Sequence, residues 1–261
     1  PYLTTEYGNP SSLYSIGRKA KKAIEKSRRQ VAELINCNPH EIYFTGSGSE
    51  SDNTALKGFA YANRERGNHI ITSKIEHHAI LETCETLEKQ GFEVSYINVD
   101  KDGVLKIEEL RNAIKPSTIL ISVMTANNEI GTIQPIEEIA KIAHERNIVF
   151  HTDAVQAISN MHIDVKKMDI DMLSLSGHKI NAPKGIGALY IKDGIKIEKY
   201  INGGHQERNL RAGTENVAGI VGIGKACELA KRNMDTHIKN LSKLRNYYIM
   251  RLQKEMPDKI R

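Results

Sequence analysis

Three consecutive segments establish the fold class: STILISVM at residues 117–124, IEEIAKIAHER at 136–146 and IVFHT at 148–152. The first and third are apolar almost throughout, which is typical of strands buried on both faces of a sheet. The middle segment has apolar residues at helical spacing. A strand, a helix and a strand in this order predict two parallel strands joined by a crossover helix.

The same alternation extends from these segments toward both ends of the chain. Further helices are predicted at 16–35, 49–63, 77–90, 107–114 and 217–252, and further strands at 41–45, 69–72, 93–98, 171–175 and 186–191. A Gly/Arg-rich loop at 203–213 precedes the last helix. The chain is therefore predicted to be an α/β protein with a mainly parallel sheet. Ligands of such sheets bind beyond the carboxyl ends of the strands.

The composition of the 261 residues excludes several classes of protein. Hydrophobic residues make up 39% and charged residues 26%, without a low-complexity tract, so an ordered globular chain is expected. No apolar run reaches the roughly 18 residues of a membrane span, and residues 1–6 lack the features of a signal peptide. The widely spaced Cys37, Cys84 and Cys227 argue against a disulfide framework and favour a reducing compartment, the cytoplasm.

The basic balance of the chain does not indicate a nucleic-acid-binding protein. The net charge is +5 and the isoelectric point is about 9.0. The basic excess lies at 18–29 and 225–261, both with helical spacing, which is typical of solvated helix faces. With four Phe and no Trp, the sequence shows no aromatic residues interleaved with basic ones, so direct nucleic-acid binding is not expected.

No metal site is expected. Residues 98–103 with Glu109 nearly fit a calcium loop, but the preceding segment has a strand pattern, position 1 is Asn98, and no second loop pairs with it. A strand-to-helix turn on Asp102-Gly103 is the preferred interpretation. Three histidines, His78, His151 and His205, show no metal-like spacing.

A small-residue turn, Gly46-Ser47-Gly48-Ser49, follows one predicted strand and opens a helix. It resembles a dinucleotide fingerprint, but Ser51 occupies the position of the third glycine. Small residues at a helix N-terminus let backbone N–H groups approach an anion, so a phosphate group fits this turn. The alternative is a plain helix cap made by Ser49 and Asp52.

Two chemically important residues follow other predicted strands. Asp153 comes directly after the strand at 148–152, where it is either a solvated helix cap or the partner of a buried cation. Lys179 follows the strand at 171–175, where a lysine beside glycine is often simply exposed. A phosphate turn, a carboxylate and a lysine at the carboxyl ends of one sheet are the groups that pyridoxal 5′-phosphate (PLP) requires.

Eight motifs stand in order at residues 8–12, 45–53, 76–77, 127–131, 151–156, 176–179, 183–185 and 203–214. Together they resemble the cysteine desulfurases of the iron–sulfur-cluster type, within the class-V aminotransferase family and the fold-type-I class of PLP enzymes. The resemblance extends over essentially the whole chain. It implies PLP as the cofactor and a large domain of three layers, helices on both sides of a mainly parallel sheet.

The resemblance assigns five residues to the ring of the cofactor and to the substrate. It implies that Lys179 carries the cofactor covalently, that Asp153 pairs with the pyridine nitrogen, and that Gln156 hydrogen-bonds the phenolic oxygen. His77 is expected to stack on the ring face and to serve in proton transfer; the alternative is a histidine that only caps a helix. Asn128 is expected near the substrate carboxylate and the cofactor oxygen. Lys179 and His77 are thus the expected catalytic residues.

Five more residues are assigned to phosphate. The resemblance implies that Gly48, Ser49, Ser176 and His178 bind the phosphate of the same subunit. Thr214 is expected to reach the phosphate of the other subunit of a homodimer. The family usually has Thr where this chain has Ser49, a difference that keeps the hydroxyl group.

The activity implied by the resemblance is the conversion of L-cysteine to L-alanine. Sulfur leaves as a persulfide on a protein cysteine and passes to acceptor or scaffold proteins for iron–sulfur cluster assembly. In the family that cysteine, and an Arg for the substrate carboxylate, lie far beyond the lysine. None of the three cysteines of this chain occupies a matching position, so the 261 residues alone are expected to be inactive.

The expected domain organisation follows from the same comparison. Residues 1–15 are expected to form an N-terminal segment, 16–226 the PLP-binding large domain, and 227–261 a long helix that leads toward a small domain absent from this chain. Two alternatives stay open: another fold-type-I PLP enzyme, such as an aminotransferase or a selenocysteine lyase, and a PLP-binding domain without catalytic activity.

Overall fold

The computed structural model describes residues 1–257 and 259. Its centre is a sheet with the strand order β1-β7-β6-β5-β4-β2-β3. The strands are β1 (Ile42–Thr45), β2 (His69–Ser73), β3 (Glu93–Ile97), β4 (Thr118–Ser122), β5 (Val149–Asp153), β6 (Met172–Ser176) and β7 (Gly187–Ile191). The helices are α1 (Ser15–Ile35), α2 (Gly48–Ala62), α3 (His78–Glu88), α4 (Ile107–Ala113), α5 (Ile136–His144), α6 (Gln206–Asn209) and α7 (Val217–Glu255). Two 3-10 turns, Pro39–Glu41 and Gly177–Ile180, complete the elements.

The strand directions confirm the predicted α/β class with a mainly parallel sheet. β2 is parallel to β3 and β4, β4 to β5, and β5 to β6. β7 is antiparallel to both of its neighbours, β6 and β1. β1 therefore runs in the same direction as β6, although β7 separates the two. The carboxyl ends of β1, β2, β5 and β6 consequently lie along one edge of the sheet.

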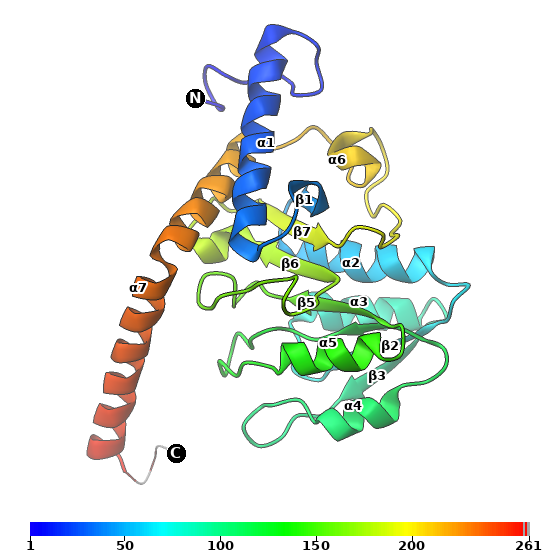
Figure 1. Cartoon of the computed structure of the whole chain (residues 1–261), viewed down its shortest axis with the longest axis vertical. Helices are drawn as coiled ribbons and strands as arrows, with labels where there is room; N and C mark the ends of the chain where they lie inside the picture. Colours follow the sequence, from blue (N-terminus) through cyan, green and yellow to red (C-terminus); the bar gives the residue numbers. More distant parts are fainter. Residues whose placement is uncertain (258, 260–261) are drawn as a thin grey trace.

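The apolar strands divide their side chains between two cores, as the expected burial on both faces requires. Ile71, Ile121, Phe150, Leu173 and Tyr190 contact the core made with α1, α4, α5 and α7. The preceding residue of each of these strands enters the other core, made with α2 and α3. The period of two along each strand produces this division. Figure 1 shows the helices on the two sides of the sheet.

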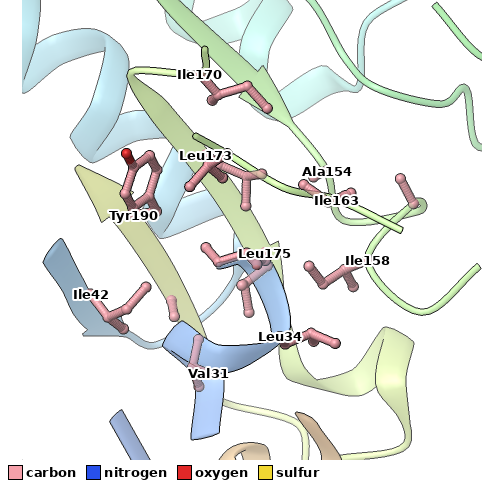
Figure 2. Packing of buried hydrophobic residues seen from close by; sticks show 14 of the residues in the cluster. Val31, Leu34, Ile42, Ala154, Ile158, Ile163, Ile170, Leu173, Leu175 and Tyr190 are labelled. Carbon is pink, nitrogen blue, oxygen red and sulfur yellow. The ribbon is translucent and has the colours of Figure 1, made fainter. Parts of the chain in front are cut away.

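The first of these cores joins the N-terminal helix to the sheet. Figure 2 shows Val31 and Leu34 of α1 approaching Leu175 of β6, with Ile158 beside them and Tyr190 of β7 farther along the sheet. All five side chains are at least nine-tenths buried. α1 is thus held to the sheet by apolar packing.

The long last helix packs first against α1 and then extends away from the domain (Figure 1). Gly224 permits close approach, because a Cβ atom there would lie 2.5 Å from the Cβ of Ser27. Cys227 and Met234 remain buried in the same core. Beyond them the exposed large apolar residues of the helix are Leu241, Leu244, Tyr247, Tyr248, Ile249 and Met250. The division into domains stays a prediction; the helix itself continues unbroken across residue 226.

The predicted helices and strands are confirmed to within a few residues at their ends, and the structure adds one short α-helix and the two 3-10 turns. The loop at 203–213 contains the short α6, in which Glu207 and Arg208 have left-handed backbone angles with φ of 45° and 55°. Residues 98–106 form the predicted turn between β3 and α4, where the Asp100 carboxylate accepts hydrogen bonds from the N–H groups of Asp102 and Val104. Across the described residues, no helix is both long and apolar enough to span a bilayer.

Candidate active site

A pocket of about 230 Å³ lies at the edge of the sheet where β1, β5 and β6 end. It is lined by Ser47, Gly48, Ser49, Asp52, His77, Met124, Asn128, Asp153, Val155, Gln156, Ser176, His178 and Lys179. Nine of the ten residues that the sequence assigns to a site are in this set. The tenth, Thr214, is exposed between α6 and α7 and does not line the pocket.

Asp153 ends β5 and provides a buried carboxylate in the wall of the pocket. Its side chain accepts a hydrogen bond from the Val155 N–H at 2.8 Å, and the residue is only 6% exposed. Burial raises the pKa of Asp153, while the Val155 N–H and the nearby His77 act against that rise. The interpretation as a solvated helix cap is therefore wrong. A buried carboxylate of this kind is ready to pair with a cation that enters the pocket.

The turn after β1 forms one end of the pocket. Ser47 caps α2, because its Oγ accepts a hydrogen bond from the Glu50 N–H at 3.1 Å; the suggested cap by Ser49 and Asp52 is wrong. A Cβ atom on Gly48 would lie 2.9 Å from Val155 Cγ2 and 3.2 Å from Ser176 Cβ. Only glycine leaves this corner open, and the N-terminus of a helix of 15 residues favours an anion there.

Ser176 and His178 extend the same end of the pocket from the end of β6. The Ser176 Oγ lies 2.8 Å from His178 Nδ1, so the hydroxyl and the ring hold one another in place. Gly177 between them packs tightly, since a Cβ there would lie 2.7 Å from Ile186 Cγ2. The 3-10 turn that begins at Gly177 directs Lys179 to the pocket, where the lysine is exposed. Lysine and carboxylate thus reach one cavity from neighbouring strands.

His77 occupies the N-cap position of α3, after β2. Its Nδ1 accepts a hydrogen bond from the Ala79 N–H at 3.1 Å. A ring whose Nδ1 accepts this bond carries its proton on Nε2 when neutral. His77 therefore both caps the helix and lines the pocket, so the two interpretations of this residue are compatible. Its proposed stacking on a ring remains a prediction.

Two further lining residues of the pocket come from loops. Asn128 follows β4, and its amide group donates to Glu129 Oε1 at 3.0 Å. Gln156 follows β5 in the segment that begins with Asp153. Both also line a larger neighbouring groove bounded by the second half of α7, which includes Ile238 and Leu241. The pocket and the groove are thus neighbours that share Asn128 and Gln156 in their walls.

Two buried carboxylates near Asp153 are not among the site residues predicted from the sequence. Asp52 is 1% exposed, its Oδ1 has no hydrogen-bond partner, and burial followed by the charge of Asp153 raises its pKa. Glu76 accepts hydrogen bonds from Ser73 Oγ and from the Met124 N–H, and burial raises its pKa to about 8. The sequence contains one indication for Asp52. It lies four residues after Gly48, about one helical turn, so the two residues are on the same face of α2.

A neutral histidine lies on β5 close to Asp153, beneath the lining of the pocket. His151 is fully buried, with Nδ1 2.9 Å from Ser122 Oγ and Nε2 3.0 Å from Ser174 Oγ. Burial lowers its pKa to about 3, so it carries no charge at neutral pH. It is placed two residues before Asp153 on the same strand, and the period of two directs both side chains to one face. It supports the site through hydrogen bonds between side chains.

The residues present fit PLP in three respects. The Asp153 carboxylate matches a protonated ring nitrogen, because a buried carboxylate is stabilised by a cation beside it. The corner at Gly48 is open where any Cβ would close it, and it faces the start of α2. Lys179 supplies an amine in the same cavity. Among the described residues, no group of three or more His, Cys, Asp or Glu is arranged to hold a metal ion.

Comparison with known proteins agrees with this geometry. The family model described as aminotransferase class-V matches residues 1–258. The cysteine desulfurase IscS of Clostridium botulinum is 57% identical over 258 residues, which are 99% of this chain and 65% of that protein. The IscS of Methanosarcina thermophila is 59% identical over 254 residues, which are 97% of this chain and 63% of that protein. The chain therefore spans slightly less than two thirds of the length of these relatives.

Solved structures show the same fold. A NifS-like protein superimposes with a TM-score of 0.94 at 42% identity and covers 97% of this chain and 70% of its own. SspA in complex with cysteine superimposes with a TM-score of 0.85 at 45% identity, over 87% of this chain and 66% of its own. The match over residues 1–258, together with this shared fold, shows that the chain belongs to the class-V aminotransferase family.

Proposed function

We propose that this protein takes part in PLP-dependent cysteine desulfuration, in which L-cysteine is converted to L-alanine and the sulfur passes to an acceptor protein for iron–sulfur cluster assembly. The observation that carries the proposal is the convergence of Lys179, Asp153 and the start of α2 on one pocket. The class-V family is one of PLP enzymes, and the relatives at 57% and 59% identity bear the name cysteine desulfurase. One solved relative, SspA, is described as a complex with cysteine.

Each residue has a distinct task in this proposal. When bound, PLP supplies an electron sink for the carbon that carries the substrate amino group. Asp153 holds a proton on the pyridine nitrogen, and the Lys179 amine takes and returns the proton at the substrate Cα. Gly48 and Ser49 donate backbone N–H groups to the phosphate, with the Ser176 hydroxyl and His178 beside them.

The remaining residues orient the ring and the substrate. His77 would contact the ring face and hold a proton on Nε2, Gln156 would donate its amide to the phenolic oxygen, and Asn128 would orient the substrate carboxylate. Thr214 lies outside this pocket, and we propose that it binds the phosphate of a second copy of the chain. That role makes the homodimer part of the proposal.

The thiol that attacks the substrate sulfur comes from outside these 261 residues in our proposal. Cys84 and Cys227 are fully buried, and burial raises the pKa of both thiols, that of Cys227 to about 12. Burial raises the pKa of Cys37 to about 12 as well. A thiolate is the reactive form of cysteine, and none of these three lines the pocket. They are unsuited to sulfur transfer.

Reduction with borohydride tests the lysine assignment. The chain is loaded with PLP, reduced, digested and analysed by mass spectrometry. We expect the pyridoxyl group on the peptide that contains Lys179, and we expect Lys179→Ala to abolish the label. Lys184→Ala serves as the matched control, since Lys184 is exposed nearby but does not line the pocket. A label on Lys184 or Lys192 in the wild-type chain would contradict the proposal.

A further inference from the structure

Two ion pairs tie the loop before α7 to the helices on either side of β1, α1 and α2. The first joins Glu207 to Arg28 through two contacts of 2.7 Å, and both residues are at least nine-tenths buried. Glu207 Oε2 also accepts a hydrogen bond from the Phe44 N–H at 2.7 Å. Glu207, Arg208 and Asn209 all have positive φ, which is unfavourable for residues with side chains. These buried contacts therefore hold the loop in a strained conformation.

The second pair reaches the turn that forms the phosphate end of the pocket. Arg211 Nε donates to Glu50 Oε1 at 2.8 Å, and Nη2 donates to Oε2 at 3.2 Å. Glu50 Oε2 also accepts a hydrogen bond from the Gly46 N–H at 2.8 Å. The Arg211 and Glu50 side chains are 25% and 14% exposed, so water screens the pair only in part. Glu50 thus links Arg211 to the turn itself.

The position of Glu50 creates an electrostatic problem for anion binding. It lies in the first turn of α2, where an acidic side chain is favourable to the helix. Ser47, Gly48 and Ser49 line the pocket, and Glu50, the next residue, does not. A carboxylate so close to the turn repels a phosphate dianion unless a cation compensates it. Arg211 is the cation that contacts it.

We propose that Arg211 is a positioning residue for phosphate: its guanidinium neutralises Glu50 and so lets the turn Gly46–Ser49 accept a phosphate dianion. This inference rests on the proposed function, because it takes that turn as the phosphate end of the PLP site. Arg211 lies on the loop that also carries Thr214, so the pair joins the phosphate turn to the segment assigned to a second copy. The planar guanidinium of Arg can donate two N–H groups to one carboxylate, which suits Glu50 because this side chain also accepts a hydrogen bond from the Gly46 N–H.

Neutralising one or both partners of the Arg211–Glu50 pair separates this role from simple anchoring of the loop. Arg211→Gln leaves the Glu50 charge uncompensated, so phosphate affinity falls. Glu50→Gln in the same chain removes that charge, so the double variant recovers affinity even though the ion pair is gone. If Arg211 acts only as an anchor, the double variant stays as weak as the single one. Arg211→Lys keeps the charge without the fork and is expected to keep most of the affinity.

The experiment uses three probes on the full chain: PLP, pyridoxal, which lacks the phosphate, and inorganic phosphate. Binding of the first two is followed by absorbance, and binding of inorganic phosphate by the rise in melting temperature. We expect Arg211→Gln to weaken PLP and phosphate binding at least about tenfold and pyridoxal binding less than about threefold. The Glu50→Gln/Arg211→Gln double variant is expected within about threefold of wild type for all three probes.

Arg208→Gln is the matched control. Arg208 lies on the same loop and donates to the Ile42 carbonyl, but it makes no contact with Glu50. We expect its phosphate affinity to equal that of wild type within about threefold. An equal loss in Arg208→Gln and Arg211→Gln would show that loop integrity alone matters and would overturn the inference.

Three other results would overturn the inference: unchanged phosphate affinity in Arg211→Gln, a double variant as weak as Arg211→Gln, and no stabilisation of the wild-type chain by inorganic phosphate. If Arg211→Gln fails to fold, Arg211→Lys tests the inference in its place. Arg211→Lys keeps the positive charge, so retained phosphate affinity supports the inference and a loss of phosphate affinity contradicts it. Failure of the proposed function gives a different pattern: inorganic phosphate stabilises the chain and depends on Arg211, but PLP forms no adduct with Lys179.

Discussion

At the scale of single residues, three carboxyl groups in and beside the pocket are buried, and burial raises their pKa values. Asp153 and Asp52 have their pKa values raised by burial, and Glu76 has its pKa raised to about 8. Carboxylates in such surroundings bind a proton or a cation readily. The site therefore prefers a ligand that brings positive charge to Asp153 and negative charge to the start of α2. PLP has both.

Asp153→Asn is the sharpest test of that preference. The amide has nearly the same shape but cannot carry the negative charge that keeps the ring nitrogen protonated. We expect the exchange of the Cα hydrogen of L-alanine with deuterated water, followed by NMR in the PLP-loaded chain, to slow by about 10²–10³. Asp102→Asn, at an exposed turn, is the control and should exchange at the wild-type rate. A wild-type exchange rate in Asp153→Asn would show that the only role of the carboxylate is to accept the hydrogen bond from the Val155 N–H.

Glu76 gives a prediction about pH. Its pKa is about 8 in the folded chain and returns to about 4.5 on unfolding. Between these values the folded state keeps a proton that the unfolded state releases, so the contribution of Glu76 to stability is present at low pH and is lost as the pH rises toward 8. Glu76→Gln removes this dependence. The melting temperature of the variant should therefore rise relative to wild type from about pH 5 to about pH 8, whereas the exposed Glu65→Gln should show no such trend.

At the scale of elements, the packing of α1 on α7 depends on the absence of a side chain. Glycine inside a helix is normally about 1 kcal/mol less favourable than alanine, so Gly→Ala usually stabilises. At Gly224 the new Cβ would lie 2.5 Å from the Cβ of Ser27 and 2.7 Å from its Cα. The two helices must then separate.

We therefore expect Gly224→Ala to destabilise the fold by about 1–3 kcal/mol, which corresponds to a fall of about 2–12 °C in melting temperature. Calorimetry or circular dichroism checks this. Lys239→Ala in the exposed half of α7 should change stability by no more than about 0.5 kcal/mol. A more stable Gly224→Ala variant would mean that the helices do not approach as closely as the structure shows.

At the scale of the whole molecule, the pocket and the available thiols are separate. Two of the three cysteines lie in the cores and the third is half-buried beyond α1. In our proposal the pocket supplies the groups for cofactor binding and for proton transfer at the substrate Cα. Desulfuration needs a thiolate in addition, and no thiol in this sequence is placed to provide it.

The 261-residue chain is therefore expected to bind PLP and to release no sulfide from L-cysteine. The measurement combines purified chain, PLP, L-cysteine and a reductant, and determines alanine and sulfide over many turnovers. The triple variant Cys37→Ser/Cys84→Ser/Cys227→Ser should behave as wild type, provided that it folds. Turnover of the wild-type chain that is lost in this variant would identify one of the three as the nucleophile.

Local patterns were sufficient to predict the elements and three places in the pocket, the turn at Gly48, Asp153 and Lys179, whereas the other assigned residues depended on the family resemblance. Apolar runs separated by helical patterns identify buried parallel strands, and a residue directly after such a strand reaches the ligand edge whatever the strand order. For this reason the sequence alone predicts that Asp153, Lys179 and Gly48 lie at the ligand edge of the sheet. The role of each still depends on the family resemblance, because position at an edge does not specify chemistry.

The strand order and the contacts that follow from it required the tertiary structure. β7 inserts between β1 and β6 and ends beside the start of β1, and the loop before α7 then returns to the turn after β1. Arg211 thereby meets Glu50, and Glu207 meets Arg28, across 161 and 179 residues of chain. The same folding buries Asp52 near Asp153 and leaves Thr214 outside the pocket. Periodicity reports which face of an element is buried, but partners between distant elements depend on how the whole sheet assembles.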